Sequence, residues 1–191
     1  MKILVLDNYD SFTFNLVHYL QELAPEAELD VYRNDKISLD EIEAYDKILL
    51  SPGPGIPDEA GIMKAVIEKY SPSKSILGIC LGHQGIAEVF GGELLNMERV
   101  YHGISTPVKI TSSSYIFDEI PEVFDAGRYH SWLVKDQKLP EAFRIIAADM
   151  EGSIMGIQHN DFDLIGLQFH PESVMTTHGK KMIKNWLTNK N

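Results

Sequence analysis

The feature that most constrains this chain is a glycine–cysteine–glycine pattern within residues 75–86, Ser-Ile-Leu-Gly-Ile-Cys-Leu-Gly-His-Gln-Gly-Ile. The apolar residues before the cysteine predict a short buried strand, and the residues after it predict the start of a helix. Cys80, the only cysteine, stands between Gly78 and Gly82. This spacing is typical of a nucleophile elbow, a strained strand-to-helix turn whose flanking positions have no room for side chains.

Such a turn places the thiol at a helix N-terminus, where the helix dipole and the free N–H groups favour the thiolate. The alternative is a buried structural cysteine, which is among the commonest roles of a lone cysteine. On this stretch alone both interpretations stay open, and Cys80 is a candidate nucleophile.

The composition limits the partners and the compartment. The 191 residues carry a formal net charge of −11 without a block of basic residues, so we expect no nucleic-acid partner. A single cysteine allows no internal disulfide, which is typical of a reducing compartment. The apolar run at residues 2–6 is too short for a signal peptide or a membrane helix, so we expect a cytoplasmic protein without membrane contact.

The first half of the chain alternates between strand and helix patterns, which is typical of a parallel sheet with right-handed crossovers. Strands are predicted over residues 2–6, 28–33, 47–50 and 75–79. Helices are predicted over residues 12–23, with Asp10 or Ser11 as the N-cap, over 62–70, and, after a capping box at 38–41, as a short helix through Tyr45.

After Gly91 and Gly92 short strand patterns predominate. They cover residues 93–95, 105–111, 123–129, 144–148, 154–159 and 164–169, and a terminal helix includes residues 182–187. We interpret these strands as an antiparallel continuation of the same domain, because no linker, repeat or low-complexity segment marks a boundary. The sequence therefore predicts a single α/β domain over residues 1–191, with an open, mostly parallel sheet, flanking helices and added antiparallel strands.

A rigid loop follows the third predicted strand. Residues 51–57, Ser-Pro-Gly-Pro-Gly-Ile-Pro, fix the loop through prolines and leave its backbone open to close approach at the glycines. An ordinary strand-to-helix connection is the alternative, and a phosphate loop is not expected because no Gly-Lys-Ser/Thr follows. Since ligands bind at the carboxyl ends of parallel strands, we expect Asn8, this loop and Cys80 at one edge of the sheet.

A second polar group ends the last predicted strand, at Gln168-Phe169-His170-Pro171-Glu172. Pro171 favours an extended conformation for the residue before it, in which His170 and Glu172 would share a face. A carboxylate beside an imidazole fixes its tautomer and stabilises the imidazolium. With a thiol, these residues would complete a Cys-His-acid set for covalent acyl transfer.

Three alternatives stay open for this segment. A single His-x-Glu is usually an exposed strand end. His170, Glu172 and His178 could bind a metal, but no His-Glu-x-x-His or paired-cysteine spacing is present and we expect no metal. The third alternative is that Cys80 and His170 never meet. Against it, both residues follow apolar strands, and a last strand that returned to the parallel sheet would bring them to one edge.

Five motifs follow one another along nearly the whole chain. They are Asp-Asn-Tyr-Asp-Ser-Phe at 7–12, Ser-Pro-Gly-Pro-Gly at 51–55, Gly-Ile-Cys-Leu-Gly-His-Gln at 78–84, Arg-Tyr-His-Ser at 128–131 and Gln-Phe-His-Pro-Glu-Ser at 168–173. Together they make the sequence resemble the class I (triad) glutamine amidotransferases, whose fold is flavodoxin-like. The resemblance implies Cys80 as nucleophile, His170 as general base and acid, and Glu172 as the partner that orients the imidazole.

The same resemblance implies the groups that bind the substrate, glutamine. The backbone N–H groups of Gly53 and Leu81 would form an oxyanion hole for the developing charge. The groups that hold glutamine would be Gly55, Gln84 and the backbone at Ser131 and Trp132. No cofactor is implied.

The implied activity is a glutaminase subunit that releases ammonia through a cysteine thioester. Its expected partner is the large subunit (component I) of a chorismate-utilising synthase, with anthranilate as the product and aminodeoxychorismate, or both, as the alternative. The rival interpretations are a free-standing cysteine hydrolase for γ-glutamyl compounds and a non-catalytic, flavodoxin-like binding module. Tyr9, an aromatic residue in the polar loop after the first strand, is a candidate anchor for the partner.

Overall fold

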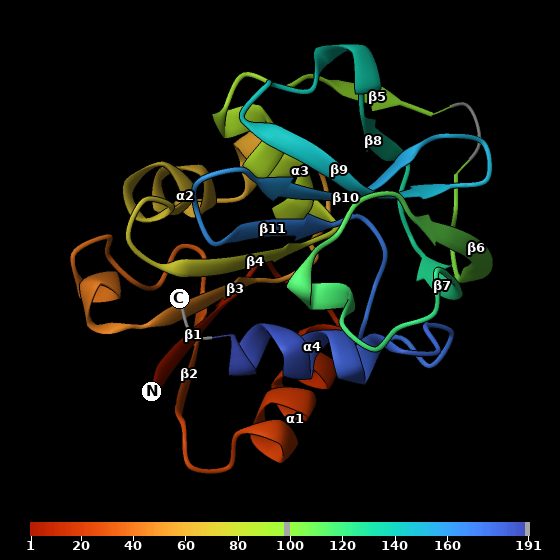
Figure 1. The fold of residues 1–191 in the computed structure, drawn as a ribbon. Coiled ribbons are helices and arrows are strands. Elements are labelled where there is room, and N and C mark those ends of the chain that lie inside the picture. Colours follow the sequence, from red (N-terminus) through yellow and green to blue (C-terminus); the bar gives the residue numbers. More distant parts are fainter. Residues whose placement is uncertain (98–99, 190–191) are drawn as a thin grey trace.

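The structure, a computed structural model that describes residues 1–97 and 100–189, is built on one large mixed sheet (Figure 1). Within the described residues the large sheet has nine strands in the order β2-β1-β3-β4-β11-β10-β9-β6-β7, and β5 and β8 form a separate pair. The strands of the large sheet are β1 (Lys2–Asp7), β2 (Glu28–Arg33), β3 (Lys47–Leu50), β4 (Ser75–Ile79), β6 (Ile104–Ile110), β7 (Val123–Arg128), β9 (Phe143–Asp149), β10 (Ile154–His159) and β11 (Leu164–Leu167). The small pair comprises β5 (Leu94–Asn96) and β8 (Trp132–Val134).

Strands β2, β1, β3, β4 and β11 run parallel, and β10, β9, β6 and β7 continue the sheet in antiparallel pairs. The predicted open, mostly parallel sheet with antiparallel strands added is confirmed. Strand β11, which was expected to belong to the antiparallel continuation, instead lies parallel to β4 with Leu167 opposite Ile79. The return of the last strand to the parallel sheet, which Cys80 and His170 need in order to meet, is therefore present. This return brings the segment after β11 to the edge where β4 ends.

Helices cover both faces of the parallel strands. The α-helices are α1 (Thr13–Leu23), α2 (Met63–Tyr70), α3 (Leu81–Val89) and α4 (Gly179–Thr188), and the 3₁₀ turns are η1 (Glu41–Ala44), η2 (Pro57–Glu59), η3 (Tyr115–Phe117) and η4 (Asp136–Lys138). Helices α1 and α4 pack on one face, and α2 and α3 on the other (Figure 1). Successive residues of β1 point to opposite faces of the sheet, so the strand contributes to two hydrophobic cores. Ile3 packs in the core with α1 and α4, and Leu4 packs in the core with α2 and α3. None of the helices in the described part of the chain is long and apolar enough to span a membrane.

Three local expectations are wrong in detail. Phe12, not Asp10 or Ser11, is the N-cap of α1, and the Asp10 carboxylate accepts a bond from the Phe12 N–H at 2.7 Å. The short helix after Ser38 is a single 3₁₀ turn, although Glu41 does accept a bond from the Ser38 N–H at 2.9 Å, as in half of a capping box. Strand β8 was not expected, because three residues are too few to show alternation.

Asn8 joins the carboxyl ends of β1 and β3 at the expected edge. Its backbone N–H donates to Ser51 Oγ and its Nδ2 donates to the Ser51 carbonyl, each at 2.8 Å. The side chain is buried, and its Oδ1 accepts from Asn34 Nδ2 at 3.0 Å. Asn8 therefore fixes the start of the proline–glycine loop.

The close packing of α3 on the sheet requires the two glycines beside Cys80. A Cβ atom at Gly78 would lie 2.6 Å from the carbonyl carbon of Gly82, and one at Gly82 would lie 2.8 Å from the carbonyl oxygen of Leu50. Both distances are shorter than a van der Waals contact. The prediction that neither position has room for a side chain is confirmed.

We expect Gly78→Ala to lower the free energy of unfolding by about 2–3 kcal/mol, because the added methyl overlaps backbone atoms of α3. Urea unfolding of the whole chain measures the loss. Gly152→Ala is the control, because Gly152 has a φ of +89° with no atom within 4 Å of an added Cβ. Only backbone strain applies there, about 1–2 kcal/mol. A loss for Gly78→Ala no larger than the loss for the control would contradict the steric account.

Candidate active site

Cys80 has the strained backbone that a nucleophile elbow requires. Its φ is 52° and its ψ is −97°, which are uncommon values for a residue with a side chain. The Cys80 N–H donates to the Leu167 carbonyl at 2.8 Å, and the Cys80 carbonyl accepts from the Gln84 N–H at 3.0 Å. Because Cys80 is the N-cap of α3, the strained residue stands at the positive end of that helix.

His170 and Glu172 lie together just beyond β11. The distance from His170 Nδ1 to Glu172 Oε1 is 2.7 Å, and both side chains are almost completely buried. The expected contact is present, but the expected extended backbone is wrong: the chain turns here, with the Ser173 N–H donating to the His170 carbonyl at 3.2 Å. Thr176 Oγ1 donates to the same carbonyl at 2.6 Å and holds the turn.

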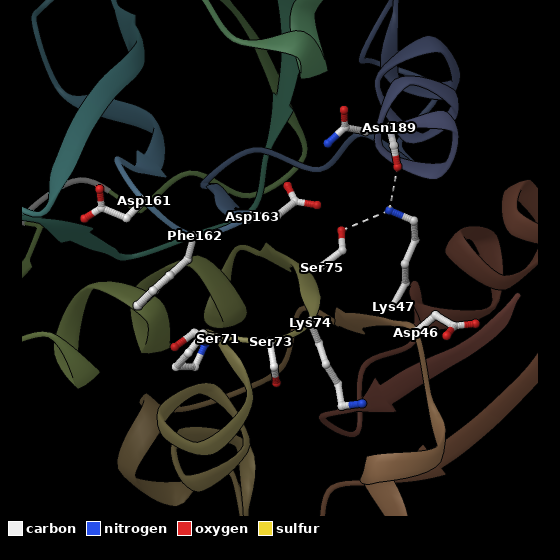
Figure 2. A pocket seen from close by; sticks show the side chains of 11 residues that line it. Asp46, Lys47, Ser71, Ser73, Lys74, Ser75, Asp161, Phe162, Asp163 and Asn189 are labelled. Atoms are coloured by element: carbon white, nitrogen blue, oxygen red, sulfur yellow. Dashed lines mark hydrogen bonds between the residues drawn. The ribbon is translucent and has the colours of Figure 1, made fainter. Parts of the chain in front are cut away.

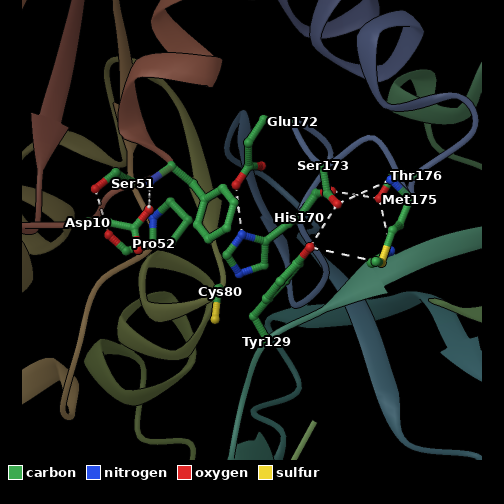
Figure 3. Close-up of polar contacts among 12 residues, drawn as sticks. Asp10, Ser51, Pro52, Cys80, Tyr129, His170, Glu172, Ser173, Met175 and Thr176 are labelled. Atoms are coloured by element: carbon green, nitrogen blue, oxygen red, sulfur yellow. Dashed lines mark hydrogen bonds and ion pairs between the residues drawn. The ribbon is translucent and has the colours of Figure 1, made fainter. Parts of the chain in front are cut away.

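The His170 ring lies between a carboxylate and the thiol (Figure 3). Burial lowers the pKa of this imidazole, but its contacts with Cys80 and Glu172 outweigh burial and raise the pKa well above its ordinary value. Since Nδ1 faces Glu172, the other ring nitrogen is left for the thiol. A protonated imidazole in that position stabilises a thiolate.

Two aromatic rings enclose the imidazole. The ring centroid of Tyr129 lies 4.8 Å from that of His170, and the centroid of Phe12 lies 5.8 Å away. Asp10 lies close enough for its carboxyl to interact with His170 and Glu172, and burial raises the pKa of Asp10. The sequence assigned no contact with the imidazole to these three residues, although all three lie in the motifs at 7–12 and 128–131.

A cavity of about 160 Å³ opens beside the thiol. Its lining residues are Gly53, Pro54, Gly55, Cys80, Gln84, Tyr129, His130, Ser131 and Trp132. Every residue expected to bind substrate lines this cavity except Leu81, whose side chain is buried. Leu81 is the first residue of α3, where backbone N–H groups have no acceptor within the helix.

Gln168 connects the cavity wall to the thiol. Its Nε2 lies 3.6 Å from Cys80 Sγ and donates toward it, while its Oε1 accepts from Gln84 Nε2 at 3.3 Å. The side chain is fully buried. Sequence reasoning gave Gln168 no role, although a polar residue at the end of an apolar strand was an available signal.

A larger hollow, of about 590 Å³, lies at the opposite edge of the sheet, near the amino ends of β3 and β4 (Figure 2). Lys47 in its wall is buried, which lowers the pKa of its ammonium group. The ammonium donates to Ser75 Oγ and to the Trp186 carbonyl, each at 3.0 Å. Lys47 thus caps the C-terminus of α4, and the described residues that line the hollow include neither a cysteine nor a histidine.

The arrangement at Cys80 is suited to covalent acyl transfer. It combines a thiol at a helix N-terminus, an imidazole that can carry the proton and a carboxylate that orients the imidazole. Within residues 1–97 and 100–189, no group of three or more histidine, cysteine, aspartate or glutamate side chains could hold a metal ion.

Comparisons with known proteins agree with this chemistry. The family described as Glutamine amidotransferase class-I matches residues 4–190. The aminodeoxychorismate/anthranilate synthase component 2 of Bacillus subtilis is 48% identical over 187 residues, 97% of this chain and 95% of that protein. The anthranilate synthase component 2 of Thermus thermophilus is 45% identical, over 98% of this chain and 92% of that protein. A glutamine amidotransferase structure from Thermotoga maritima, 19% identical, has the same fold with a TM-score of 0.79 over 90% of this chain and 76% of that one.

One buried histidine in α3, His83, couples the stability of the fold to pH. His83 is fully buried, and its ring packs so closely on β11 that a Cβ at Gly166 would lie 2.7 Å from His83 Nδ1. Burial lowers the pKa of His83 to about 4. Below its ordinary pKa of 6.5, the unfolded chain therefore binds a proton that the folded chain does not.

We expect the free energy of unfolding to fall as the pH is lowered from 6.5 toward 4, because over this range the unfolded chain protonates His83 and the folded chain does not. Above pH 6.5 His83 is neutral in both states and causes no loss. At pH 5 the loss should be about 2 kcal/mol. Urea unfolding at pH 7 and at pH 5 measures it, and His83→Gln should reduce the difference between the two pH values by that amount. His18→Gln is the control: it removes only a surface pair with Glu22 at a side chain that is 68% exposed, and it should change the difference by less than about 0.5 kcal/mol. If His83→Gln also leaves it unchanged, another group is responsible.

Proposed function

The chain belongs to the class I glutamine amidotransferases, and on that basis we propose that it is the glutaminase subunit of a chorismate-aminating synthase. The observation that carries the proposal is the placement of buried His170 between Glu172 and the strained Cys80. The reaction is hydrolysis of the side-chain amide of glutamine to glutamate and ammonia.

In the first half of the reaction Cys80 Sγ attacks the amide carbon. The carbonyl oxygen gains negative charge, which the backbone N–H groups of Gly53 and Leu81 stabilise. The C–N bond then breaks, and His170 gives its proton to the departing nitrogen, so that ammonia leaves and a thioester remains.

In the second half His170 acts as a base. It takes a proton from water, whose oxygen attacks the thioester carbon, and the C–S bond breaks to release glutamate and restore the thiolate. Glu172 accepts from Nδ1 throughout, so that the other ring nitrogen always faces the reacting atoms. Gly55, Gln84 and the backbone at Ser131 and Trp132, which line the cavity, hold the glutamine.

The ammonia goes to a partner, the component I subunit that binds chorismate. Anthranilate is the expected product of that partner. The second candidate function is that this chain supplies ammonia to both an anthranilate synthase and an aminodeoxychorismate synthase, because the Bacillus subtilis relative is named for both. The proposed location of the protein is the cytoplasm, and residues 1–191 are proposed to form a single glutamine amidotransferase domain. A non-catalytic binding module does not account for a strained cysteine beside a buried His–Glu pair.

We expect Cys80→Ser to lower the rate of glutamine-dependent synthesis by the reconstituted synthase at least about 10³-fold. Synthesis from added ammonia should stay within about twofold of the unchanged complex, because the thiol serves only to release ammonia. Product formation from glutamine and from ammonium salt, measured side by side, separates the two effects. Glutamine-dependent turnover that survives the substitution would remove Cys80 from the mechanism.

We also expect Tyr9→Ala to weaken association with component I by about tenfold, as for an aromatic interface anchor. Tyr9 is 47% exposed at the edge that carries Cys80, and its hydroxyl donates to Asp35 at 2.7 Å. Tyr9→Phe removes only that hydrogen bond and serves as the control. Glutamine-dependent product formation is titrated against component I, with a thermal melt of the isolated chain. A midpoint unchanged by Tyr9→Ala would place the interface elsewhere.

A further inference from the structure

A buried cluster of polar and charged side chains begins at His130 in the wall of the substrate cavity and continues away from it through Arg128 to Asp149. Its members are Arg128, His130 and Asp149, which are 1%, 4% and 8% exposed. Arg128 Nη1 donates to Asp149 Oδ2 at 2.8 Å, and Arg128 Nε donates to His130 Nε2 at 3.1 Å. The guanidinium also lies 3.8 Å from the centroid of the Tyr101 ring, which restricts its plane. None of these contacts involves the reacting atoms.

The direction of each hydrogen bond in the cluster is fixed by chemistry. Arginine has only donors, so His130 Nε2 must accept and carry no proton. The proton of the neutral ring is therefore on Nδ1, which donates to the Trp132 carbonyl at 3.0 Å. Burial and the adjacent Arg128 charge lower the pKa of His130 to about 3, so the ring is neutral at any working pH.

The chain of bonds ends on the backbone that lines the cavity. The Trp132 carbonyl accepts from His130 Nδ1 and also from Gln84 Nε2, at 3.1 Å. The Ser131 carbonyl accepts from the Met97 N–H at 2.8 Å. Both peptide groups on either side of the Trp132 Cα are therefore held in one orientation.

We propose that Arg128 and His130 are positioning residues for glutamine, which fix the backbone at Ser131 and Trp132 in its substrate-binding orientation. The inference rests on the proposed function, since glutamine is the ligand in question. It assigns Arg128 the task of selecting one histidine tautomer. The other tautomer would place a lone pair of Nδ1 against the Trp132 carbonyl and remove the bond.

The test separates the two bonds of His130 with two variants of the whole chain. In His130→Asn the amide nitrogen takes the place of Nδ1 and keeps a donor to Trp132, while the partner for Arg128 is lost. In His130→Gln the amide oxygen takes the place of Nε2 and keeps an acceptor for Arg128, while the donor to Trp132 is lost. The probe is 6-diazo-5-oxo-L-norleucine, a glutamine analogue that alkylates an activated thiol, and the readout is the concentration that gives half-maximal inactivation.

We expect His130→Gln to raise that concentration about tenfold and His130→Asn to raise it less than about threefold, the range expected for loss of one hydrogen bond. Alkylation of Cys80 by iodoacetamide, which needs no glutamine site, should change less than about twofold in both. Arg128→Lys keeps a cation near Asp149 but loses the planar fork, and it should also raise the concentration several-fold. If His130→Gln does not fold, the result for Arg128→Lys decides whether the Arg128–His130 contact supports glutamine binding.

A buried histidine outside the cluster supplies the control. His159 is also 4% exposed, but it packs among Phe90, Phe143 and Phe162, so His159→Asn should lower the melting temperature without changing the half-maximal concentration. Equal half-maximal concentrations in the wild type and the His130 variants would overturn the inference alone. The inference would also be overturned if the half-maximal concentration rose in proportion to the drop in melting temperature in every variant, His159→Asn included. A wild-type chain that reacts with iodoacetamide but never with the glutamine analogue would overturn the proposed function, and the inference with it.

Discussion

The contact between α3 and the sheet at Gly78 and Gly82 is the constraint on which the rest of the site depends. Because neither residue has a Cβ, the helix approaches β4 closely enough for the chain to turn at a single residue, and Cys80 takes its positive φ. Such strain costs about 1–3 kcal/mol. Ile79 and Ile86, on either side of the turn, are fully buried, and each contributes about 1.5–3 kcal/mol. The packing around the turn is therefore sufficient to hold Cys80 in its strained conformation.

The return of β11 beside β4 supplies the second half of the site. Leu167 lies opposite Ile79, so the residues that follow the two strands leave the sheet at the same edge. A slip of one residue in this pairing would move His170 by about 3.3 Å relative to Cys80. The Cys80 N–H, which donates to the Leu167 carbonyl at 2.8 Å, holds the register at the point where an error would separate thiol and imidazole.

The parallel half of the fold could be predicted because its buried strands are apolar runs separated by polar loops, and the tight turn at Cys80 could be predicted from the glycines beside it. The His170–Glu172 contact was expected for a reason that proved wrong, since a turn and not an extended strand joins them. Gln168 and Arg128 were not assigned roles, because their contacts depend on the order of distant strands. Side-chain periodicity specifies the buried face of a strand but not its neighbour.

Three buried histidines around one site have pKa values shifted in different directions, and the surroundings of each ring explain its shift. Glu172 and the thiol raise the pKa of His170, whereas burial with the Arg128 charge lowers the pKa of His130, and burial alone lowers that of His83. With these lowered pKa values, both His83 and His130 are neutral near pH 7. Of the three rings, only that of His170, which lies beside Cys80, has a raised pKa. The cation beside His130 also has a geometric consequence: because arginine can only donate, Arg128 selects the tautomer in which His130 Nδ1 donates to the Trp132 carbonyl in the cavity wall.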